Sequence, residues 1–345
     1  MTDLADEVDT VKMGDETAVR YVPEGIEEGD EEVYPNLLYI KPDGRAVRLD
    51  PPRVPANSDF LNGVASKDVD IDTENGLWGR IYLPESVAKK GPDVKVPVLV
   101  FFHGGGFCLL SPDSLIFTCF CEDAARVSEV VVISMSYRLT PEHRLPAAYD
   151  DAFTATLWLQ KQAELQAKGE GGEPWLTKHA NFSKCFVIGE SAGANIVHHL
   201  GVQLAKTDPN PLSIRGLILL VPFFGEEERT DSEQLDGAGD DLVPLSVFNR
   251  FWELALPIGA NRDHPYSNVT ELPLSKVLVV LGTKDPLYNR QIEYSNALRR
   301  AGRNHQLLEV PEGGHGFRFI PEFASEVRRV EQAIRAFIHE DNDSA

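Results

Sequence analysis

Short apolar runs recur along the chain at lengths typical of strands. They lie at Val69–Ile71, Leu77–Leu83, Val96–Phe102, Val130–Tyr137, Lys184–Ile188, Leu217–Phe224, Val277–Leu281 and Gln306–Val310. The first two alternate between apolar and polar positions, which predicts the edge of a sheet. The later runs are almost continuously apolar, which predicts strands that are buried on both faces.

Segments with helical spacing separate these runs. We expect helices at about Ala147–Gln166, directly after Ser191, at about Asn289–Arg300 and at Phe323–His339. In the last segment the apolar residues recur at spacings of four, three, four and three, which is the period of a helix with one buried face. Alternating strands and helices predict an α/β fold with a mainly parallel central sheet covered by helices on both faces.

Two segments depart from this rhythm. The excursion from Gly225 to Tyr266 is charged or small in its first half, and it then carries a short aromatic-rich helix between Pro244 and Pro257. We interpret this helix as a cap over the active site, with plain core packing as the alternative. Near the N-terminus, the runs around Pro42-Asp43-Gly44 predict a hairpin or lid that contributes to the same cap.

Acidic side chains are concentrated near the N-terminus. The 345 residues include 33 basic and 54 acidic side chains, a net charge of −21, and residues 1–32 alone carry 12 acidic against 2 basic ones. We therefore expect a solvated, flexible leader over residues 1–33 and one domain over residues 34–345. The overall negative charge disfavours nucleic acid and membrane surfaces as partners.

The cysteines and histidines point to no metal or disulfide framework. Four cysteines lie in or beside apolar stretches without framework spacing, so we expect buried, reduced thiols and neither a metal nor a cofactor. The chain shows no signal peptide and no apolar run of membrane-spanning length. These features favour a cytoplasmic protein and are also compatible with a nuclear pool. We expect the protein to be a monomer or a weak homodimer.

A nucleophilic serine is predicted where one buried strand meets a helix. Gly189-Glu190-Ser191-Ala192-Gly193 follows the run ending at Ile188 and opens into a helical pattern. In such an elbow a strained turn presents the serine, and the two glycines allow strand and helix to cross closely. The pentapeptide alone could arise by chance, so its context carries the prediction.

A second glycine cluster follows the strand ending at Phe102. In His103-Gly104-Gly105-Gly106-Phe107 the backbone amides can turn toward a ligand oxygen, which predicts an oxyanion hole. A flexible turn is the alternative. We interpret His103 as a side chain that stabilises the turn rather than as a base.

A serine hydroxyl needs an imidazole to accept its proton and a carboxylate to orient that imidazole. Asp285 and His315 follow Ser191 in that order, and each lies in a loop after a predicted strand. The carboxyl ends of parallel strands meet at one edge of the sheet. The sequence therefore predicts a Ser191–His315–Asp285 catalytic triad.

Four motifs together resemble a known family. His-Gly-Gly-Gly-Phe at 103–107, Tyr-Arg-Leu-Thr-Pro-Glu-His at 137–143, Gly-Glu-Ser-Ala-Gly at 189–193 and His-Gly-Phe at 315–317 resemble the hormone-sensitive-lipase class of α/β-hydrolases, in its plant carboxylesterase branch. The resemblance spans roughly Leu37 to His339. It implies the α/β-hydrolase fold and an oxyanion hole formed by the amides of Gly105, Gly106 and Ala192.

The resemblance also bears on substrate. Residues 222–230 resemble a plant subgroup that includes strigolactone-cleaving esterases. We expect a carboxylesterase that acts through an acyl-enzyme on a small to medium apolar ester, with a strigolactone-like butenolide as a candidate. The expected pocket residues are Phe107, Leu110, Phe248, Trp252 and Phe317.

Rival functions remain open on the same scaffold. The branch also holds gibberellin receptors, which lack the catalytic histidine, and dehydratases with threonine at the nucleophile position. This chain has His315 and Ser191 at those positions. Cyclase relatives can keep much of the triad, so a non-hydrolytic enzyme of specialised metabolism stays an alternative, as does a hormone-binding receptor.

Overall fold

The computed structural model describes residues 25–27, 29–49, 51–91, 94–207, 210–235 and 242–340. Most of the expected flexible leader therefore lies outside the described residues. Contacts divide the chain into two units, one up to Leu49 and one from residue 50 onward. The domain boundary expected between residues 33 and 34 falls within a strand of the first unit.

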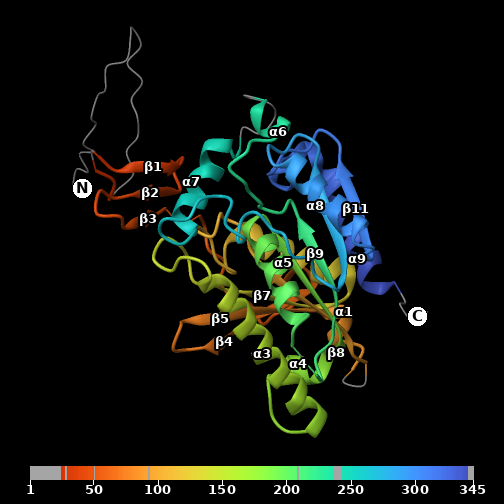
Figure 1. The fold of residues 1–345 in the computed structure, drawn as a ribbon. Coiled ribbons are helices and arrows are strands. Elements are labelled where there is room, and N and C mark those ends of the chain that lie inside the picture. Colours follow the sequence, from red (N-terminus) through yellow and green to blue (C-terminus); the bar gives the residue numbers. More distant parts are fainter. Residues whose placement is uncertain are drawn as a thin grey trace, which may run out of the picture. The chain divides into compact units, whose positions relative to one another are not determined.

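The N-terminal unit is a small antiparallel sheet. Its strands are β1 (Glu31–Tyr34), β2 (Leu38–Ile40) and β3 (Ala46–Arg48), in the order β1-β2-β3 (Figure 1). The turn between β2 and β3 is closed by the Gly44 amide, which donates to the Lys41 carbonyl at 2.8 Å. The expected hairpin around Pro42-Asp43-Gly44 is confirmed.

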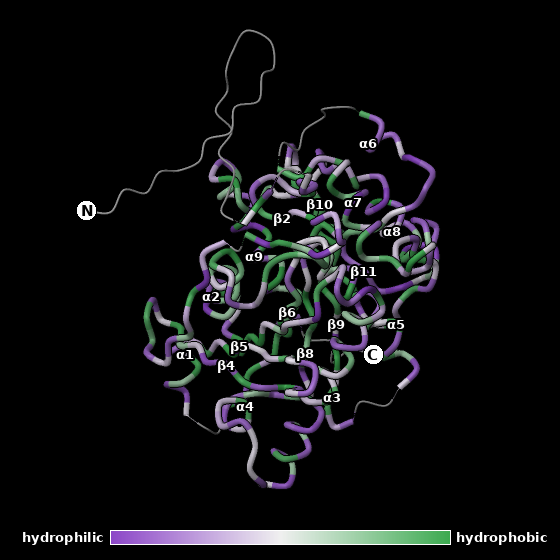
Figure 2. The backbone as a smooth tube through the Cα atoms, turned by 90° about the vertical axis from the view of Figure 1, so that its left-hand side faces the viewer, coloured by the Kyte–Doolittle hydropathy of each residue, from purple (hydrophilic) through white to green (hydrophobic). Residues whose placement is uncertain are grey.

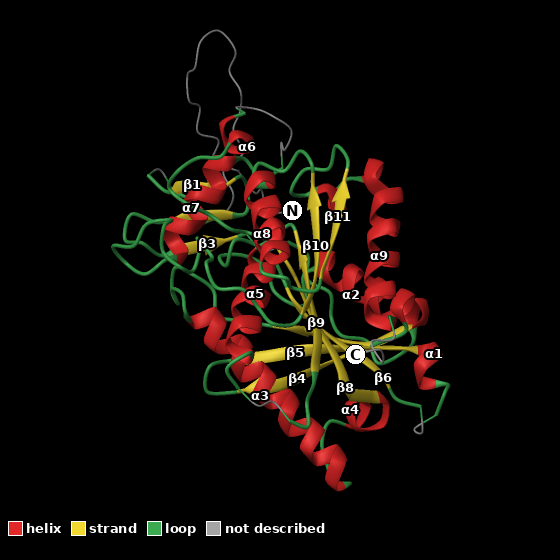
Figure 3. Cartoon of the chain, turned by 45° about the vertical axis from the view of Figure 1, so that its right-hand side comes forward, coloured by secondary structure: helices red, strands yellow, loops and turns green. Residues whose placement is uncertain are grey.

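The second unit is organised around an eight-stranded sheet in the order β11-β10-β9-β8-β6-β7-β5-β4 (Figure 3). The strands are β4 (Val64–Asp72), β5 (Leu77–Pro84), β6 (Val96–Phe102), β7 (Val131–Met135), β8 (Ala180–Glu190), β9 (Ile214–Leu220), β10 (Lys276–Gly282) and β11 (His305–Val310). From β7 to β11 every neighbouring pair is parallel, whereas β4 and β5 pair antiparallel at one edge. The predicted mainly parallel sheet is confirmed.

Helices cover both faces of this sheet. They are α1 (Glu85–Ala88), α2 (Leu115–Ser128), α3 (Ala147–Lys168), α4 (Pro174–His179), α5 (Ala192–Leu204), α6 (Asp231–Gln234), α7 (Leu245–Ala255), α8 (Tyr288–Arg300) and α9 (Ala324–His339). Figure 3 shows α2 and α9 on one side of the sheet and α3, α5 and α8 on the other. None of the described helices is both long and apolar enough to cross a membrane.

The hydrophobic core lies where α2 and α9 meet the central strands. Hydrophobic residues are concentrated in those strands, and the outer helices are more polar (Figure 2). The buried face of α9 carries Val330, Ile334 and Phe337, as its apolar period predicts. All four cysteines are free; Cys108, Cys121 and Cys185 are buried, but Cys119 is exposed on α2, so the prediction of four buried thiols was wrong at that position.

The strand β9 ends earlier than its sequence predicts. The apolar run continues to Phe224, but the backbone turns at Val221, where φ is 41°, and the strand stops at Leu220. Pro222 and Phe223 therefore lie in a loop that packs against the serine turn, where the Phe223 amide donates to the Ser191 carbonyl at 3.1 Å.

Candidate active site

Ser191 stands at the turn between β8 and α5 in a strained conformation, with φ of 54° and ψ of −117°. A Cβ at Gly189 would lie 2.2 Å from the Gly193 carbonyl oxygen, and a Cβ at Gly193 would lie 2.0 Å from that of Phe102. Only glycine fits where strand and helix cross this closely. The Ser191 amide donates to the Leu220 carbonyl at 2.9 Å, which fixes the turn to β9.

The structure brings the three residues of the predicted triad into one hydrogen-bonded chain. The Ser191 hydroxyl lies 2.8 Å from His315 Nε2, and His315 Nδ1 lies 2.8 Å from Asp285 Oδ2. Asp285 follows β10 and His315 follows β11, so each comes from the carboxyl end of its strand. With Nδ1 protonated, the imidazole donates to the carboxylate and can accept the serine proton at Nε2.

The Asp285 carboxylate is held by contacts that sequence reasoning did not predict. Its Oδ1 accepts the Leu287 amide at 2.8 Å, and its Oδ2 also accepts Gln291 Nε2 at 2.8 Å. The residues Leu287, Gln291, Tyr294 and Leu298 are buried at helical spacing on and before α8. That period is a signal for burial of Gln291, although it carries no information about the carboxylate that its amide meets.

The glycine loop after β6 lies directly beside the serine turn. An ideal Cβ at Gly104 would be only 3.4 Å from the Ser191 Cβ, and the backbone takes positive φ at Gly105 (108°) and Gly106 (61°). Within the described part of the chain, the amides of Gly105, Gly106 and Ala192 donate no hydrogen bond. These three donors are free to bind a substrate oxygen, as the resemblance implies.

His103 is a structural residue of this loop. Its Nδ1 donates to the Gly104 carbonyl at 2.8 Å, and its ring stacks on Tyr137 with centroids 4.3 Å apart. Burial disfavours the charged imidazole and lowers the pKa of His103 to about 4. The side chain is neutral at neutral pH, which agrees with its interpretation as a turn-stabilising residue.

The predicted aromatic helix of the excursion is present as α7, and it packs against both catalytic loops. Phe248 presents its ring edge-on to His315, with centroids 4.7 Å apart. Phe251 occupies the space that a Cβ at Gly106 would need, since that atom would lie 2.1 Å from the Phe251 ring. These contacts place α7 beside His315 and the glycine loop. That this helix closes over Ser191 stays a prediction, as does the contribution expected from residues 37–49.

Among the expected pocket residues, Phe248 lies beside the triad and others lie deeper. Trp252 stacks on Phe223 with centroids 4.3 Å apart and lies 5.7 Å from the Phe107 ring; both Trp252 and Phe107 are buried. These two rings belong to an aromatic layer between α7 and the loop after β9. For Trp252, the alternative of core packing describes its surroundings better than a place on the pocket wall does.

Phe317 and Leu110 face the hydrophobic core. Phe317 is buried in the cluster that includes Val330 and Ile334 of α9, and it begins a short 3-10 helix (Phe317–Phe319) that follows Gly316. Leu110, with φ of 75°, packs against the same cluster. For Phe317 this placement corrects the expected position in the pocket, and for Leu110 it assigns at least part of the side chain to the core.

The loop Tyr137–Pro146 fastens α7 by its C-terminus. Arg144 Nη1 donates to the carbonyl oxygens of Glu253 at 2.7 Å and Leu256 at 2.6 Å, and the Leu145 amide donates to that of Ala255 at 2.9 Å. A cation at the last carbonyls of a helix also opposes the negative end of its dipole. Arg144 is therefore a structural residue that holds the C-terminal end of α7.

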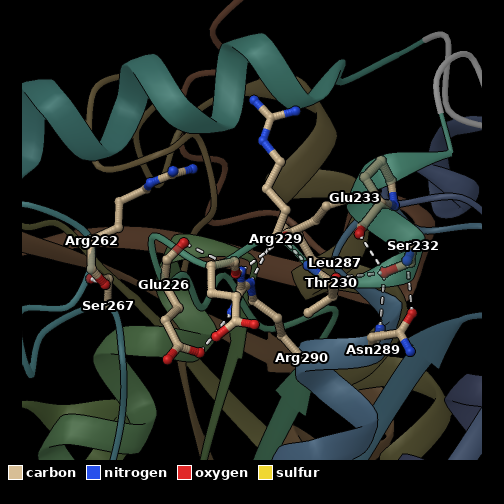
Figure 4. A network of polar contacts seen from close by, with 12 residues as sticks. Glu226, Arg229, Thr230, Ser232, Glu233, Arg262, Ser267, Leu287, Asn289 and Arg290 are labelled. Carbon is tan, nitrogen blue, oxygen red and sulfur yellow. Dashed lines mark hydrogen bonds and ion pairs between the residues drawn. The ribbon is translucent and has the colours of Figure 1, made fainter.

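The first half of the excursion is fastened to α8 (Figure 4). Arg290 forms ion pairs with Glu233 at 2.5 Å and Glu226 at 3.3 Å and donates to the Glu228 carbonyl at 2.6 Å. Asn289 Oδ1 accepts the Ser232 amide at 3.0 Å, and the Ser232 hydroxyl donates to the Pro286 carbonyl at 2.8 Å. The acidic stretch is thus tied to the loop that carries Asp285.

The described residues contain no group of three or more His, Cys, Asp or Glu side chains that could hold a metal ion. The arrangement around Ser191 offers a nucleophile, a base, an orienting carboxylate and free amide donors. These are the groups that acyl transfer requires.

The sequence matches known proteins over most of its length. Residues 99–319 match the family described as alpha/beta hydrolase fold, and residues 48–141 match the carboxylesterase family. Carboxylesterase 20 of Arabidopsis thaliana is 38% identical over 270 residues, which cover 74% of this chain and 79% of the relative. A 3-O-acetylpapaveroxine carboxylesterase of Papaver somniferum is 37% identical over 275 residues, or 76% of this chain and 86% of that protein.

Solved structures share the fold. A bacterial heroin esterase superposes with a TM-score of 0.63 at 25% identity, over 80% of this chain and 85% of that one. An esterase of Pyrobaculum calidifontis superposes with a TM-score of 0.63 at 24% identity, over 79% and 84% of the two chains. The sequence matches and the geometry agree: this chain belongs to the α/β-hydrolase fold family, in its plant carboxylesterase branch.

Proposed function

We propose that this carboxylesterase cleaves its ester through a covalent acyl-enzyme on Ser191, with His315 as general base and Asp285 as the orienting carboxylate. The observation that carries the proposal is the unbroken chain from the serine hydroxyl through the imidazole to the carboxylate, with both contacts at 2.8 Å. A neutral serine is a poor nucleophile, and this arrangement removes its proton as it attacks.

In the acylation step, Ser191 Oγ forms a bond to the ester carbonyl carbon while its proton passes to His315 Nε2. The carbonyl π electrons move onto oxygen, and the amides of Gly105, Gly106 and Ala192 stabilise that oxyanion. The imidazolium, stabilised by Asp285, then gives its proton to the departing alkoxide as the tetrahedral intermediate collapses. The first product is the alcohol, and the acyl group stays on Ser191.

In the deacylation step, His315 accepts a proton from water as the water oxygen attacks the acyl carbonyl. The same three amides hold the second oxyanion. Collapse breaks the bond to Ser191, which recovers the proton, and releases the carboxylic acid. No group beyond those of the chain and the two reactants is needed to balance either step.

The surroundings of the triad favour an ester with apolar groups of small to medium size. Phe248 presents an aromatic edge to the imidazole, and Phe251 packs on the glycine loop beside the oxyanion donors. A strigolactone-like butenolide remains a specific candidate because residues 222–230 resemble strigolactone-cleaving esterases. In this fold, however, Glu226 and the Glu228 carbonyl bind Arg290, so part of that stretch serves as scaffold.

The experiment uses the purified 345-residue chain with p-nitrophenyl esters of increasing acyl length and with a butenolide hormone analogue. We expect turnover of the short-chain esters and stoichiometric labelling of Ser191 by an alkyl phosphonate fluoride, detected by peptide mass spectrometry. Ser191→Ala should lower kcat by on the order of 10⁶ with the fold intact. Binding of the butenolide without turnover of any ester would instead support a receptor, and residual activity of Ser191→Ala within tenfold of the parent would remove Ser191 from the mechanism.

A further inference from the structure

Gln291 makes a direct contact with the triad carboxylate. Its Nε2 lies 2.8 Å from Asp285 Oδ2, the same oxygen that accepts Nδ1 of His315 at 2.8 Å. The other carboxylate oxygen accepts the Leu287 amide. Gln291 is therefore the side-chain donor that shares an oxygen with the imidazole.

The orientation of the Gln291 amide is set by two acceptors. Besides Asp285, Nε2 reaches the Pro222 carbonyl oxygen at 3.3 Å, and a side-chain amide has two N–H groups to serve both. The reversed orientation would place Gln291 Oε1 against a carboxylate and a carbonyl, which repel it. The NH₂ group of Gln291, and not its oxygen, therefore faces Asp285 and the Pro222 carbonyl.

Packing alone does not explain a glutamine at this position. The side chain is completely buried, and within the described residues its Oε1 has no hydrogen-bond partner. A buried amide oxygen without a partner destabilises the folded state, so an apolar side chain of similar size would be favoured if only packing mattered. The amide N–H groups are the part of the side chain that the structure uses.

The second acceptor connects the acid to the nucleophile. Pro222 immediately precedes Phe223, whose amide donates to the Ser191 carbonyl. Through one side chain, the Asp285 loop is thus joined to the loop that supports the serine turn. A displacement of either loop alters the Gln291 contacts.

We propose that Gln291 is a positioning residue of the triad, which holds the Asp285 carboxylate toward His315 and moderates the negative charge on Oδ2. This inference rests on the proposed function, because it assigns Gln291 a role through Asp285. Without the donor, Oδ2 carries more charge toward the imidazole, so His315 is protonated at higher pH. The carboxylate also loses one of the contacts that fix its orientation.

The test compares Gln291→Met, which keeps the length of the side chain and removes the donor, with Tyr294→Phe. Tyr294 lies on the same buried face of α8. Its hydroxyl hydrogen-bonds to His198 Nδ1 at 3.0 Å and not to Asp285. Hydrogen bonds to charged groups have the strength to change rates by about tenfold to a hundredfold. We expect Gln291→Met to lower kcat by that amount with KM within about twofold, and to move the acid limb of the kcat/KM profile to higher pH.

Tyr294→Phe should leave both the pH profile and kcat close to those of the parent. A double-mutant cycle with Asp285→Asn then separates positioning from general structure. If Gln291 acts through the carboxylate, Gln291→Met adds little further loss of kcat in the Asp285→Asn background, whereas a structural role predicts the same loss in both backgrounds. Gln291→Asn, which keeps an amide but shortens its reach, serves the same cycle if the methionine variant does not fold.

The outcomes are distinguishable. If Asp285→Asn and Ser191→Ala both leave ester turnover unchanged, the proposed function fails. If both variants strongly lower turnover while Gln291→Met leaves kcat and the acid limb unchanged, only the role of Gln291 is overturned. Equal losses in both backgrounds of the cycle also overturn it.

Discussion

At the residue scale, Gly106 combines two constraints in one position. Its φ of 61° is unfavourable for other residues, and the missing Cβ leaves room for the Phe251 ring. Backbone that must both present an amide and lie against an aromatic ring excludes a side chain at that position. The proposed oxyanion hole and the packing of α7 therefore depend on the same glycine.

Gly106→Ala should lower kcat for p-nitrophenyl acetate by about a hundredfold to a thousandfold, because displacement of one oxyanion donor has this effect in serine hydrolases. Gly259→Ala is the matched control, since Gly259 also has positive φ (85°) but nothing lies within 4 Å of an added Cβ. Phe251→Ala in the Gly106→Ala background should restore part of the activity. A kcat of Gly106→Ala within threefold of the parent would show that this amide is not used.

At the element scale, two of the three aromatic residues of α7, Phe248 and Trp252, lie one turn apart but in different surroundings. Phe248 lies beside His315 and Phe223, with centroids 4.7 Å and 5.4 Å apart. Trp252 stacks on Phe223 and lies near Phe107, and among the described residues it makes no ring contact with the triad. The sequence places both residues on one apolar face of the helix. Which of them contacts the triad depends on the loops that carry His315 and Phe223, which are distant from α7 in the sequence. Substitutions of the two residues should therefore have different signatures.

Phe248→Ala should reduce kcat/KM for a bulky apolar ester by about tenfold to a hundredfold, since burial of one large side chain against substrate contributes about 1.5–3 kcal/mol. An acetyl ester should lose much less, because little of it reaches the ring. The ratio of the two kinetic constants is the measurement. Equal losses for both esters would mean that Phe248 only supports His315.

Trp252→Ala should instead lower the free energy of unfolding by about 3–5 kcal/mol, the range for truncation of a buried aromatic side chain. Losses of kcat/KM should be similar for bulky and acetyl esters, because the damage is to the packing under α7. Urea unfolding of the variant measures the first effect. An unchanged free energy of unfolding, together with a loss of kcat/KM only for bulky esters, would show that Trp252 lines the substrate pocket.

The sequence predicted the triad because chain order and strand ends are local properties that the parallel sheet brings together. It could not predict that Phe317 is buried in the core cluster rather than in the pocket, because residues distant in the sequence form that cluster. Gln291 escaped prediction for a different reason. The helical period of α8 indicates that the Gln291 side chain is buried, but nothing in the sequence indicates that its amide meets the Asp285 carboxylate.

At the scale of the whole molecule, buried histidines connect folding to pH. Burial lowers the pKa of His103 and His199 to about 4 and that of His198 well below its usual value. The unfolded chain binds protons at these positions near pH 6.5, whereas the folded chain does not. Stability from these groups is therefore complete above about pH 6.5 and declines as the pH falls toward 4.

We expect the free energy of unfolding to fall over this range by up to about 1.4 kcal/mol per pH unit for each buried histidine. Chemical denaturation at a series of pH values checks the slope. His199→Asn should reduce it, because Asn does not titrate. A parent protein whose stability is flat from pH 7 to pH 4.5 would contradict the prediction.

The hydrophobic core of the second unit draws its members from residue 64 onward. Deletion of residues 1–24, which carry a large share of the acidic leader, should leave the melting temperature within a few degrees of the parent. Deletion of residues 1–49 should also leave this core folded. The effect of this second deletion on kcat/KM for bulky esters tests whether residues 37–49 contribute to the cap. An unchanged kcat/KM would rule that contribution out.

The loop Tyr137–Pro146 holds the C-terminal end of α7 by its main-chain carbonyl oxygens. Arg144 and the Leu145 amide grip main-chain carbonyl oxygens at the end of the helix, and those oxygens are the same whatever side chains the helix carries. This attachment therefore tolerates substitutions at those positions of α7 whose side chains do not pack against the catalytic loops or the aromatic layer. Substitutions in α7 can then change which esters are accepted while the triad and the glycine loop stay the same.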